Sequence, residues 1–206
     1  MPDPAAPANP LLVSTRNAHK VGEIRAILGP AFQVSDLGSL PGMPEVEETG
    51  STFEENATLK AVAASMLFDG WVIADDSGLE VDALGGAPGV LSARYAGEQS
   101  NDAANNELLL RNLLPFHGKE RSARFRCVIV LARNGRKLAV FSGAVEGGIL
   151  TTPRGSGGFG YDPLFVPQGH PESFAQLGSG VKNALSHRAM ALRGLSAWQG
   201  WDAIIS

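Results

Sequence analysis

Apolar residues recur along this chain with two spacings: a period near 3.6, which predicts helices, and short runs or strict alternation, which predict strands. The strands expected from this pattern cover residues 11–13, 32–37, 71–74, 123–133, 137–146 and 163–166. The expected helices cover residues 21–28, 51–68, 102–114 and 186–198. Because strands and helices alternate before two strands follow each other, the pattern predicts an α/β fold with a mixed, twisted sheet flanked by helices.

Short polar signals mark where these elements begin and end. Gly29-Pro30 ends the first helix, and Ser51 and Glu54 have the spacing of a capping box at the start of the second. Asn134-Gly135 lies between two strand patterns and predicts a hairpin. No internal repeat or linker divides the sequence, so we expect one domain over residues 11–206, with two lobes around a central cleft.

Composition narrows the class of protein. The 206 residues are 44% hydrophobic and 18% charged, which is ordinary for a globular protein and excludes coiled coils, collagen and disulfide scaffolds. The net charge of −4 argues against a protein that binds nucleic acid. It leaves room for a small phosphorylated ligand, which needs only a few well-placed cations.

Three features bear on the location of the protein. The longest apolar run, residues 128–132, is far shorter than the roughly 18 residues of a membrane span. Residues 1–10 contain four prolines and neither Lys nor Arg, which predicts a disordered lead-in rather than an export signal. The lone Cys127 cannot pair within the chain and favours a reducing compartment. We therefore expect a cytoplasmic protein without a membrane partner.

The strand-to-helix turn over residues 14–20 is the first candidate site. Free backbone N–H groups and the dipole at a helix N-terminus attract anions. Thr15 and Asn17 can cap the helix or donate, and Lys20 can reach a phosphate from the first turn. The turn lacks the Walker pattern, so it is no P-loop. An Asn-capped helix with a solvated lysine remains the alternative.

Two acidic pairs, Glu47-Glu48 in a loop and Asp75-Asp76 at the end of a buried strand, form the second candidate site. Carboxylates at a strand end suit Mg²⁺, and a water beside a metal and a carboxylate is a hydrolytic nucleophile. The alternative is that Asp75 caps a turn while the other three acids are solvated. Lys60, on the helix between the pairs, would be a second phosphate-binding cation or a surface lysine.

The third candidate site is a glycine-rich loop. Seven of the 25 glycines fall within residues 143–160, and they frame Phe159, on which a base can stack. Asp162 can accept from a ring N–H, and Lys182 and the helix start Ser186-His187-Arg188 add donors for ring carbonyls or phosphate. A flexible hairpin tip and a simply capped helix are the alternatives. Together, the three sites predict a Mg²⁺-dependent enzyme acting on a nucleoside phosphate.

The ordered motifs also resemble those of the inosine/xanthosine triphosphate pyrophosphatases, which remove deaminated purine nucleotides from the nucleotide pool. The resemblance covers about Leu11 to Leu195. It rests on the blocks Thr15-x-Asn17-x-x-Lys20, Glu47-Glu48-Thr49-Gly50, Phe53-x-x-Asn56-Ala57-x-x-Lys60-Ala61, Ala74-Asp75-Asp76-Ser77-Gly78-Leu79, Gly85-Gly86-Ala87-Pro88-Gly89-Val90, Ser92-Ala93-Arg94-Tyr95, Gly157-Gly158-Phe159-Gly160-Tyr161-Asp162-Pro163 and Ser186-His187-Arg188.

The resemblance implies a role for each matching residue. It makes Asp76 the acid–base residue and a ligand of Mg²⁺, with Glu47, or its neighbour Glu48, as the other ligand. Ser77 contacts the substrate. The implied triphosphate site consists of Thr15, Arg16, Asn17, Ala18, His19 and Lys20, assisted by Lys60. The implied base pocket consists of Phe159, Gly160, Tyr161, Asp162, Lys182, His187 and Arg188.

The activity implied by the resemblance is hydrolysis of inosine, deoxyinosine and xanthosine triphosphates (ITP, dITP and XTP) to the monophosphate and pyrophosphate. An activated water would attack the α-phosphorus, and donors on His187 or Arg188 would select a 6-oxo group over the amino group of adenine. The resemblance also implies a homodimer of elongated subunits. Many members carry Gly in place of Arg16 and Gly or Lys in place of His19; an arginine would be strained if the turn needs a positive φ.

Two other functional classes stay open at this point. One is a nucleotide-binding module without catalysis, and the other is a Mg²⁺-binding regulatory domain with Asp75-Asp76 as its phospho-acceptor pair. The second class would not account for the Gly-Phe-Gly-Tyr-Asp block.

Overall fold

The computed structural model describes residues 9–40, 42–43, 46–97 and 101–201. Its strands are β1 (Asn9–Val13), β2 (Phe32–Asp36), β3 (Trp71–Val81), β4 (Ser122–Arg133), β5 (Arg136–Ile149) and β6 (Phe165–Pro167). Its α-helices are α1 (Ala18–Leu28), α2 (Phe53–Ser65), α3 (Asp102–Asn112), α4 (Ser179–Leu185) and α5 (His187–Ser196). In the described part of the chain, none of the helices is both long and apolar enough to cross a lipid bilayer.

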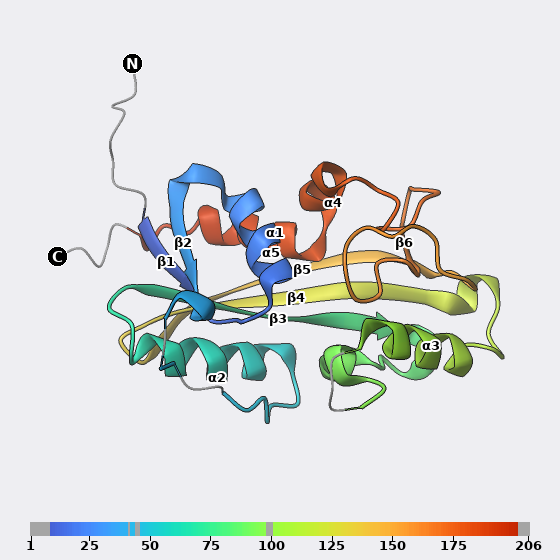
Figure 1. Cartoon of the computed structure of the whole chain (residues 1–206), viewed down its shortest axis with the longest axis horizontal. Helices are drawn as coiled ribbons and strands as arrows, with labels where there is room; N and C mark the ends of the chain where they lie inside the picture. Colours follow the sequence, from blue (N-terminus) through green and yellow to red (C-terminus); the bar gives the residue numbers. More distant parts are fainter. Residues whose placement is uncertain (1–8, 41, 44–45, 98–100, 202–206) are drawn as a thin grey trace, which may run out of the picture.

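The strands form one mixed sheet in the order β2-β1-β3-β4-β5-β6. β1 runs parallel to β2 and β3, and the other neighbours are antiparallel. Helices α1, α4 and α5 lie over one face of the elongated sheet, while α2 and α3 lie over the other (Figure 1). The predicted α/β class and mixed sheet are confirmed.

The strand β4 has apolar residues on both of its faces, and each face packs against helices. Its residues alternate sides: Cys127, Ile129 and Leu131 pack with α1 and α5, whereas Val128 and Val130 pack against α2. A further cluster around Phe165 and Phe174 fills the far end of the sheet beneath α3. Alternation predicts one apolar face for this strand, but both faces are buried because helices cover both sides of the sheet.

Asp75 and Asp76 lie in the middle of β3, so their predicted position at a strand end is wrong. β3 continues to Val81 because its antiparallel pairing with β4 runs through both residues, with Asp75 opposite Ile129 and Asp76 opposite Val128. Adjacent strand residues face opposite sides of a sheet. The two carboxylates are therefore directed toward different helical layers.

Several predicted boundaries shift. The capping box of α2 is Thr52 with Glu55, one residue after the predicted one, and the Glu55 carboxylate also accepts the backbone N–H of Ser51 at 2.7 Å. The helix ends at Ser65, followed by a turn. β1 already begins at Asn9, so the last two residues of the predicted lead-in belong to the sheet; residues 1–8 lie outside the described part. Helix α4 was not predicted.

Candidate active site

A cleft of about 690 Å³ crosses the middle of the molecule. Its walls come from the β1–α1 turn, the centre of β3, α2, the loop before α2, the glycine-rich loop and the start of α5. Segments far apart in the sequence thus contribute polar side chains to one space, and the three predicted candidate sites form parts of one site.

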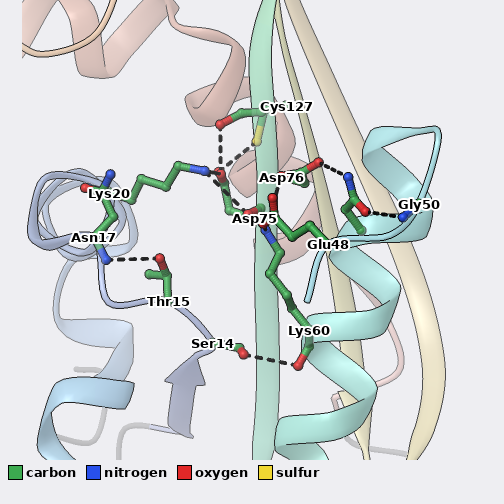
Figure 2. Close-up of polar contacts among 12 residues, drawn as sticks. Ser14, Thr15, Asn17, Lys20, Glu48, Gly50, Lys60, Asp75, Asp76 and Cys127 are labelled. Atoms are coloured by element: carbon green, nitrogen blue, oxygen red, sulfur yellow. Dashed lines mark hydrogen bonds and ion pairs between the residues drawn. The ribbon is translucent and has the colours of Figure 1, made fainter. Parts of the chain in front are cut away.

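The β1–α1 turn is built as a capped helix start. Asn17 accepts the backbone N–H of Lys20 at 3.1 Å, and Thr15 accepts that of Asn17 at 3.2 Å. This arrangement points Lys20 across the sheet, where its Nζ lies 2.6 Å from the Asp75 carboxylate (Figure 2). Lys20 is therefore paired inside the cleft, and the alternative of a solvated lysine is excluded.

Lys60 approaches β3 from the α2 side, opposite Lys20 (Figure 2). Its Nζ donates to Glu48 at 2.6 Å, to the Asp76 carboxylate at 3.1 Å and to the main-chain oxygen of Asp75 at 3.1 Å. Burial alone would lower the pKa of Lys60, but Asp76 and Glu48 outweigh it and raise that pKa. Lys60 stays charged, and it is no surface lysine.

The two adjacent aspartates have opposite pKa shifts. Burial by itself raises the pKa of the fully buried Asp75 carboxyl, but Arg188 and Lys20 outweigh it and hold that pKa well below its usual range. Burial also raises the pKa of Asp76, and Lys60 offsets this only in part. Asp75 is thus a fixed anion. Asp76, which also accepts from Asn56 at 3.3 Å, is the better proton acceptor of the two.

Asp75 is fully occupied by its partners. It accepts from Arg188 Nε at 2.8 Å, from the Ser77 hydroxyl at 2.9 Å and from the Cys127 thiol at 3.0 Å, besides Lys20. Burial raises the pKa of the Cys127 thiol, with Asp75 adding to the effect, so the thiol remains a donor. A residue so enclosed is no phospho-acceptor, so only Asp76 of the predicted acceptor pair faces the cleft.

The glycine-rich loop is held by ion pairs. Asp162 accepts the backbone N–H of Phe159 at 2.9 Å and Lys182 Nζ at 2.5 Å, and Lys182 also pairs with Glu23 at 2.7 Å. Gly158 has φ +75°, and a Cβ there would collide with the Asp162 carboxylate, so the turn requires glycine. Both of these bonds use Oδ2 of Asp162, which also lines the cleft, so its role as acceptor for a ring N–H stays a prediction.

His187 and Arg188 begin α5 behind the Ser186 cap, as predicted. Arg188 donates to Asp75, to Ser77 at 3.0 Å and to Glu23. His187 stacks on Phe125, with 4.9 Å between ring centroids. Burial and the charge of Arg188 hold the pKa of His187 well below its usual range, so its ring is neutral. Within the described residues, its buried Nδ1 has no hydrogen-bond partner.

The oxygens that could hold a metal ion surround the Lys60 ammonium. Glu48, Asp76 and the main chain of Asp75 present three oxygen atoms to one cation, a donor type that suits Mg²⁺. Among the described residues, no three His, Cys, Asp or Glu side chains gather as a metal cluster. The protein would therefore supply two carboxylates and leave other ligand positions to water and phosphate, as Mg²⁺ sites often do.

Comparisons with known proteins identify the family of the chain. The sequence profile of the Ham1 family matches residues 11–198. The chain belongs to the Ham1 family. Two relatives named dITP/XTP pyrophosphatase come from Geobacter sulfurreducens (51% identity, 94% of this chain and 98% of the relative) and Halalkalibacterium halodurans (50%, 91% and 97%). The structure of a HAM1 protein from Coxiella burnetii matches with a TM-score of 0.82 and 40% identity, covering 91% of this chain and 96% of that one.

The Ham1-family match confirms the resemblance inferred from the motifs. Most residues that the motifs assigned to the site line the cleft, but Ala18 and His19 are not part of its wall. Glu47 lies exposed on the cleft wall, whereas Glu48 reaches Lys60 and accepts from Arg94 at 3.2 Å. Arg16 donates to the carbonyl of Met43 at 2.8 Å and has no positive φ; in the described chain, Asn134 is the only non-glycine residue that does.

Glu23 belongs to the ion-pair network beside the cleft, and the motifs did not indicate it. Its carboxylate bridges Lys182 and Arg188, and it lies one turn after Lys20 on α1. A glutamate three residues from a lysine is also typical of a solvated helix face. Only the position of α4 and α5 over α1 separates the two interpretations.

Proposed function

We propose that this chain hydrolyses purine nucleoside triphosphates with a 6-oxo base (ITP, dITP and XTP) to the monophosphate and pyrophosphate, in the presence of Mg²⁺. One observation carries the proposal: two lysines, a proton-accepting carboxylate and an aromatic ring with neighbouring donors line one cleft. The names of the 50% identical relatives, dITP/XTP pyrophosphatase, support the same substrate class.

The triphosphate would bind at Lys20, Lys60 and the start of α1. Both lysine side chains are partly exposed, at 16% and 14%, so incoming phosphate oxygens can reach them. The backbone N–H groups and dipole of α1 add attraction for an anion beside Lys20. Together these groups neutralise charge on the departing pyrophosphate.

Asp76 would take the proton of the attacking water. A carboxylate whose pKa is raised by burial is a stronger base than a solvated one, and Lys60 keeps it ionised. Glu48 and Asp76 would hold Mg²⁺, which supplies Lewis-acid stabilisation of charge on the phosphate oxygens when bound. Glu48 suits this role better than the exposed Glu47, because it shares the Lys60 ammonium with Asp76.

The base would stack on Phe159 and present its 6-oxo group to His187 or Arg188. His187 lines the cleft with a neutral ring, and Arg188 is fixed by Asp75 and Glu23. Adenine offers an amino donor where these donors need an acceptor, and buried unpaired donors are strongly disfavoured.

We also propose that the protein is a cytoplasmic homodimer. The mass of the purified protein, measured by light scattering, tests whether it is a dimer.

Product analysis tests the reaction. Purified protein is incubated with ITP and Mg²⁺ in ¹⁸O-labelled water, and the products are separated and weighed by mass spectrometry. We expect inosine monophosphate carrying the label and unlabelled pyrophosphate, since attack at the α-phosphorus places the water oxygen there. Label in pyrophosphate would place the attack at the β-phosphorus, and release of single phosphate would contradict the proposed reaction.

The alternative of a non-catalytic nucleotide-binding module gives a different result in the same assay. It predicts that ITP binds, as measured by calorimetry, while no product forms with Mg²⁺. Rates with adenosine triphosphate close to those with ITP would contradict selection of the 6-oxo group.

A further inference from the structure

The ring of His19, in the first turn of α1, stacks on the ring of Phe159. The ring centroids are 5.3 Å apart and the planes differ by 17°. The two residues come from opposite ends of the chain and meet only because the glycine-rich loop folds over α1. Aromatic pairs of this geometry contribute more than the apolar area they bury.

The two rings differ in what they face. Phe159 lines the cleft, whereas His19, which stacks on its ring, is not one of the lining residues. On the cleft wall, Lys182 Nζ and Arg188 Cζ lie 4.9 and 5.9 Å from the Phe159 centroid. Both cations lie over the Phe159 ring and line the cleft, so this ring contacts the cleft cations as well as His19.

The backbone beside Phe159 is already fixed by other groups. The N–H of Phe159 donates to Asp162 at 2.9 Å, the N–H of Gly160 donates to Asp102 at 2.6 Å, and Asn106 donates to the carbonyl of Gly160 at 2.9 Å. These bonds leave the Phe159 side chain free to change its rotamer. The His19 ring restricts that rotation, because a stacked neighbour blocks the space into which the Phe159 ring would turn.

We propose that His19 is a positioning residue of the base pocket, which stacks on Phe159 and holds its ring in the orientation that receives a purine. The inference rests on the proposed function, which supplies the purine. It also assigns His19 to the base rather than to the triphosphate, whose turn is formed by Thr15, Asn17 and Lys20.

The test compares His19→Ala and His19→Phe with a control, His170→Ala, which removes a histidine outside the cleft wall. For each variant, KM and kcat are measured with ITP and Mg²⁺, together with the inhibition constant of inorganic tripolyphosphate, which has no base. Thermal unfolding of each variant reports whether its fold is intact.

We expect His19→Ala to raise KM for ITP by about 2- to 10-fold, the size of an aromatic pair, with kcat and the tripolyphosphate constant unchanged. His19→Phe should restore KM, because a phenyl ring keeps the stack. The control should match the unmodified protein. A parallel rise of KM and the tripolyphosphate constant would place His19 in the triphosphate site and overturn the inference, as would a lower KM or no change.

Failure of the proposed function gives a separate signature. The dissociation constant of ITP is measured by calorimetry in the Asp76→Asn background, with and without His19→Ala, and needs no turnover. If the unmodified chain binds but does not hydrolyse ITP, the proposed function fails while the ratio of the two constants still decides the role of His19. If ITP does not bind at all, both are overturned.

Discussion

The two ends of the cleft hold their cations in different ways. The proposed phosphate side consists of Thr15, Arg16, Asn17, Lys20, Glu48, Lys60 and Asp76, and its lysine side chains are 14–16% exposed. The base side consists of Phe159–Asp162, Lys182, His187 and Arg188, and its cation side chains are 2–6% exposed. Partly hydrated ion pairs can exchange partners with an incoming anion, whereas a buried pair keeps a fixed geometry. We infer that the phosphate side rearranges on binding and the base side is preorganised.

Asp75 connects the two sides. It binds Lys20 on the phosphate side and Arg188 on the base side, and it is itself fully buried. Because its low pKa keeps it ionised, it maintains opposite charge for both cations at once. The comparison therefore predicts that changes on the phosphate side mainly affect turnover, and that changes on the base side also affect stability.

The largest effect on turnover is expected from Asp76→Asn. The amide keeps the size of the side chain but cannot accept a proton from water, so kcat should fall by about 10²- to 10⁴-fold. The midpoint temperature of thermal unfolding should change little. Burying a carboxylate costs free energy, so replacing it with a neutral amide removes little stability. Asp82→Asn, at an exposed site that pairs with Arg124, is the matched control. Retained turnover in Asp76→Asn would remove this residue from the proposed chemistry.

The base side is tested by Arg188→Met. Loss of the guanidinium removes one of the two cations that pair with each of the carboxylates Asp75 and Glu23, which should lower the free energy of unfolding by about 3–5 kcal/mol in urea. Arg25→Met breaks the exposed pair with Asp36 and should cost about 0–1 kcal/mol. Equal losses in both variants would contradict the contrast between a buried and an exposed network.

The interior of β3 marks the limit of what the sequence could predict. Two adjacent aspartates normally end a buried strand, and the local pattern predicted such an end. Here they are tolerated because Lys20, Arg188 and Lys60 reach them from positions 55, 113 and 16 residues away in the chain. The spacing of residues within one element cannot predict partners that lie so far away in the chain.

Structural features that depend only on residues close together in the sequence could be predicted. The Asn134-Gly135 hairpin follows from two positive φ angles, and the Ser186 cap of α5 follows from its side-chain acceptor. The motifs also assigned Lys60, Asp76 and Phe159 to one site, and all three line the same cleft. The motifs could not choose between Glu47 and Glu48, since only the approach of α2 and Lys60 distinguishes the two positions.

That choice gives the next prediction. Glu48→Gln should raise the Mg²⁺ concentration needed for half-maximal activity by about 10-fold, because loss of even an outer-shell partner weakens metal binding by about that factor. Glu47→Gln, one residue earlier and exposed, should leave it unchanged. The measurement is a Mg²⁺ titration of the initial rate at saturating ITP. The reverse ranking would identify Glu47 as the ligand and would separate Glu48 from the metal site.

The smallest expected effect concerns the pH dependence of the phosphate side. The acidic limb of kcat/KM should follow the ionisation of Asp76, whose pKa is raised by burial and lowered by Lys60. Lys60→Met removes the lowering influence, so the pKa of Asp76 rises and the limb moves to higher pH; Lys60→Arg keeps a cation and should leave it in place. The ionisation of the substrate is the same in all variants and cancels in the comparison. A limb that stays fixed or moves to lower pH in Lys60→Met would mean that Asp76 is not the titrating base. The contrast between an adaptable phosphate side and a fixed base side would then not explain the catalytic activity.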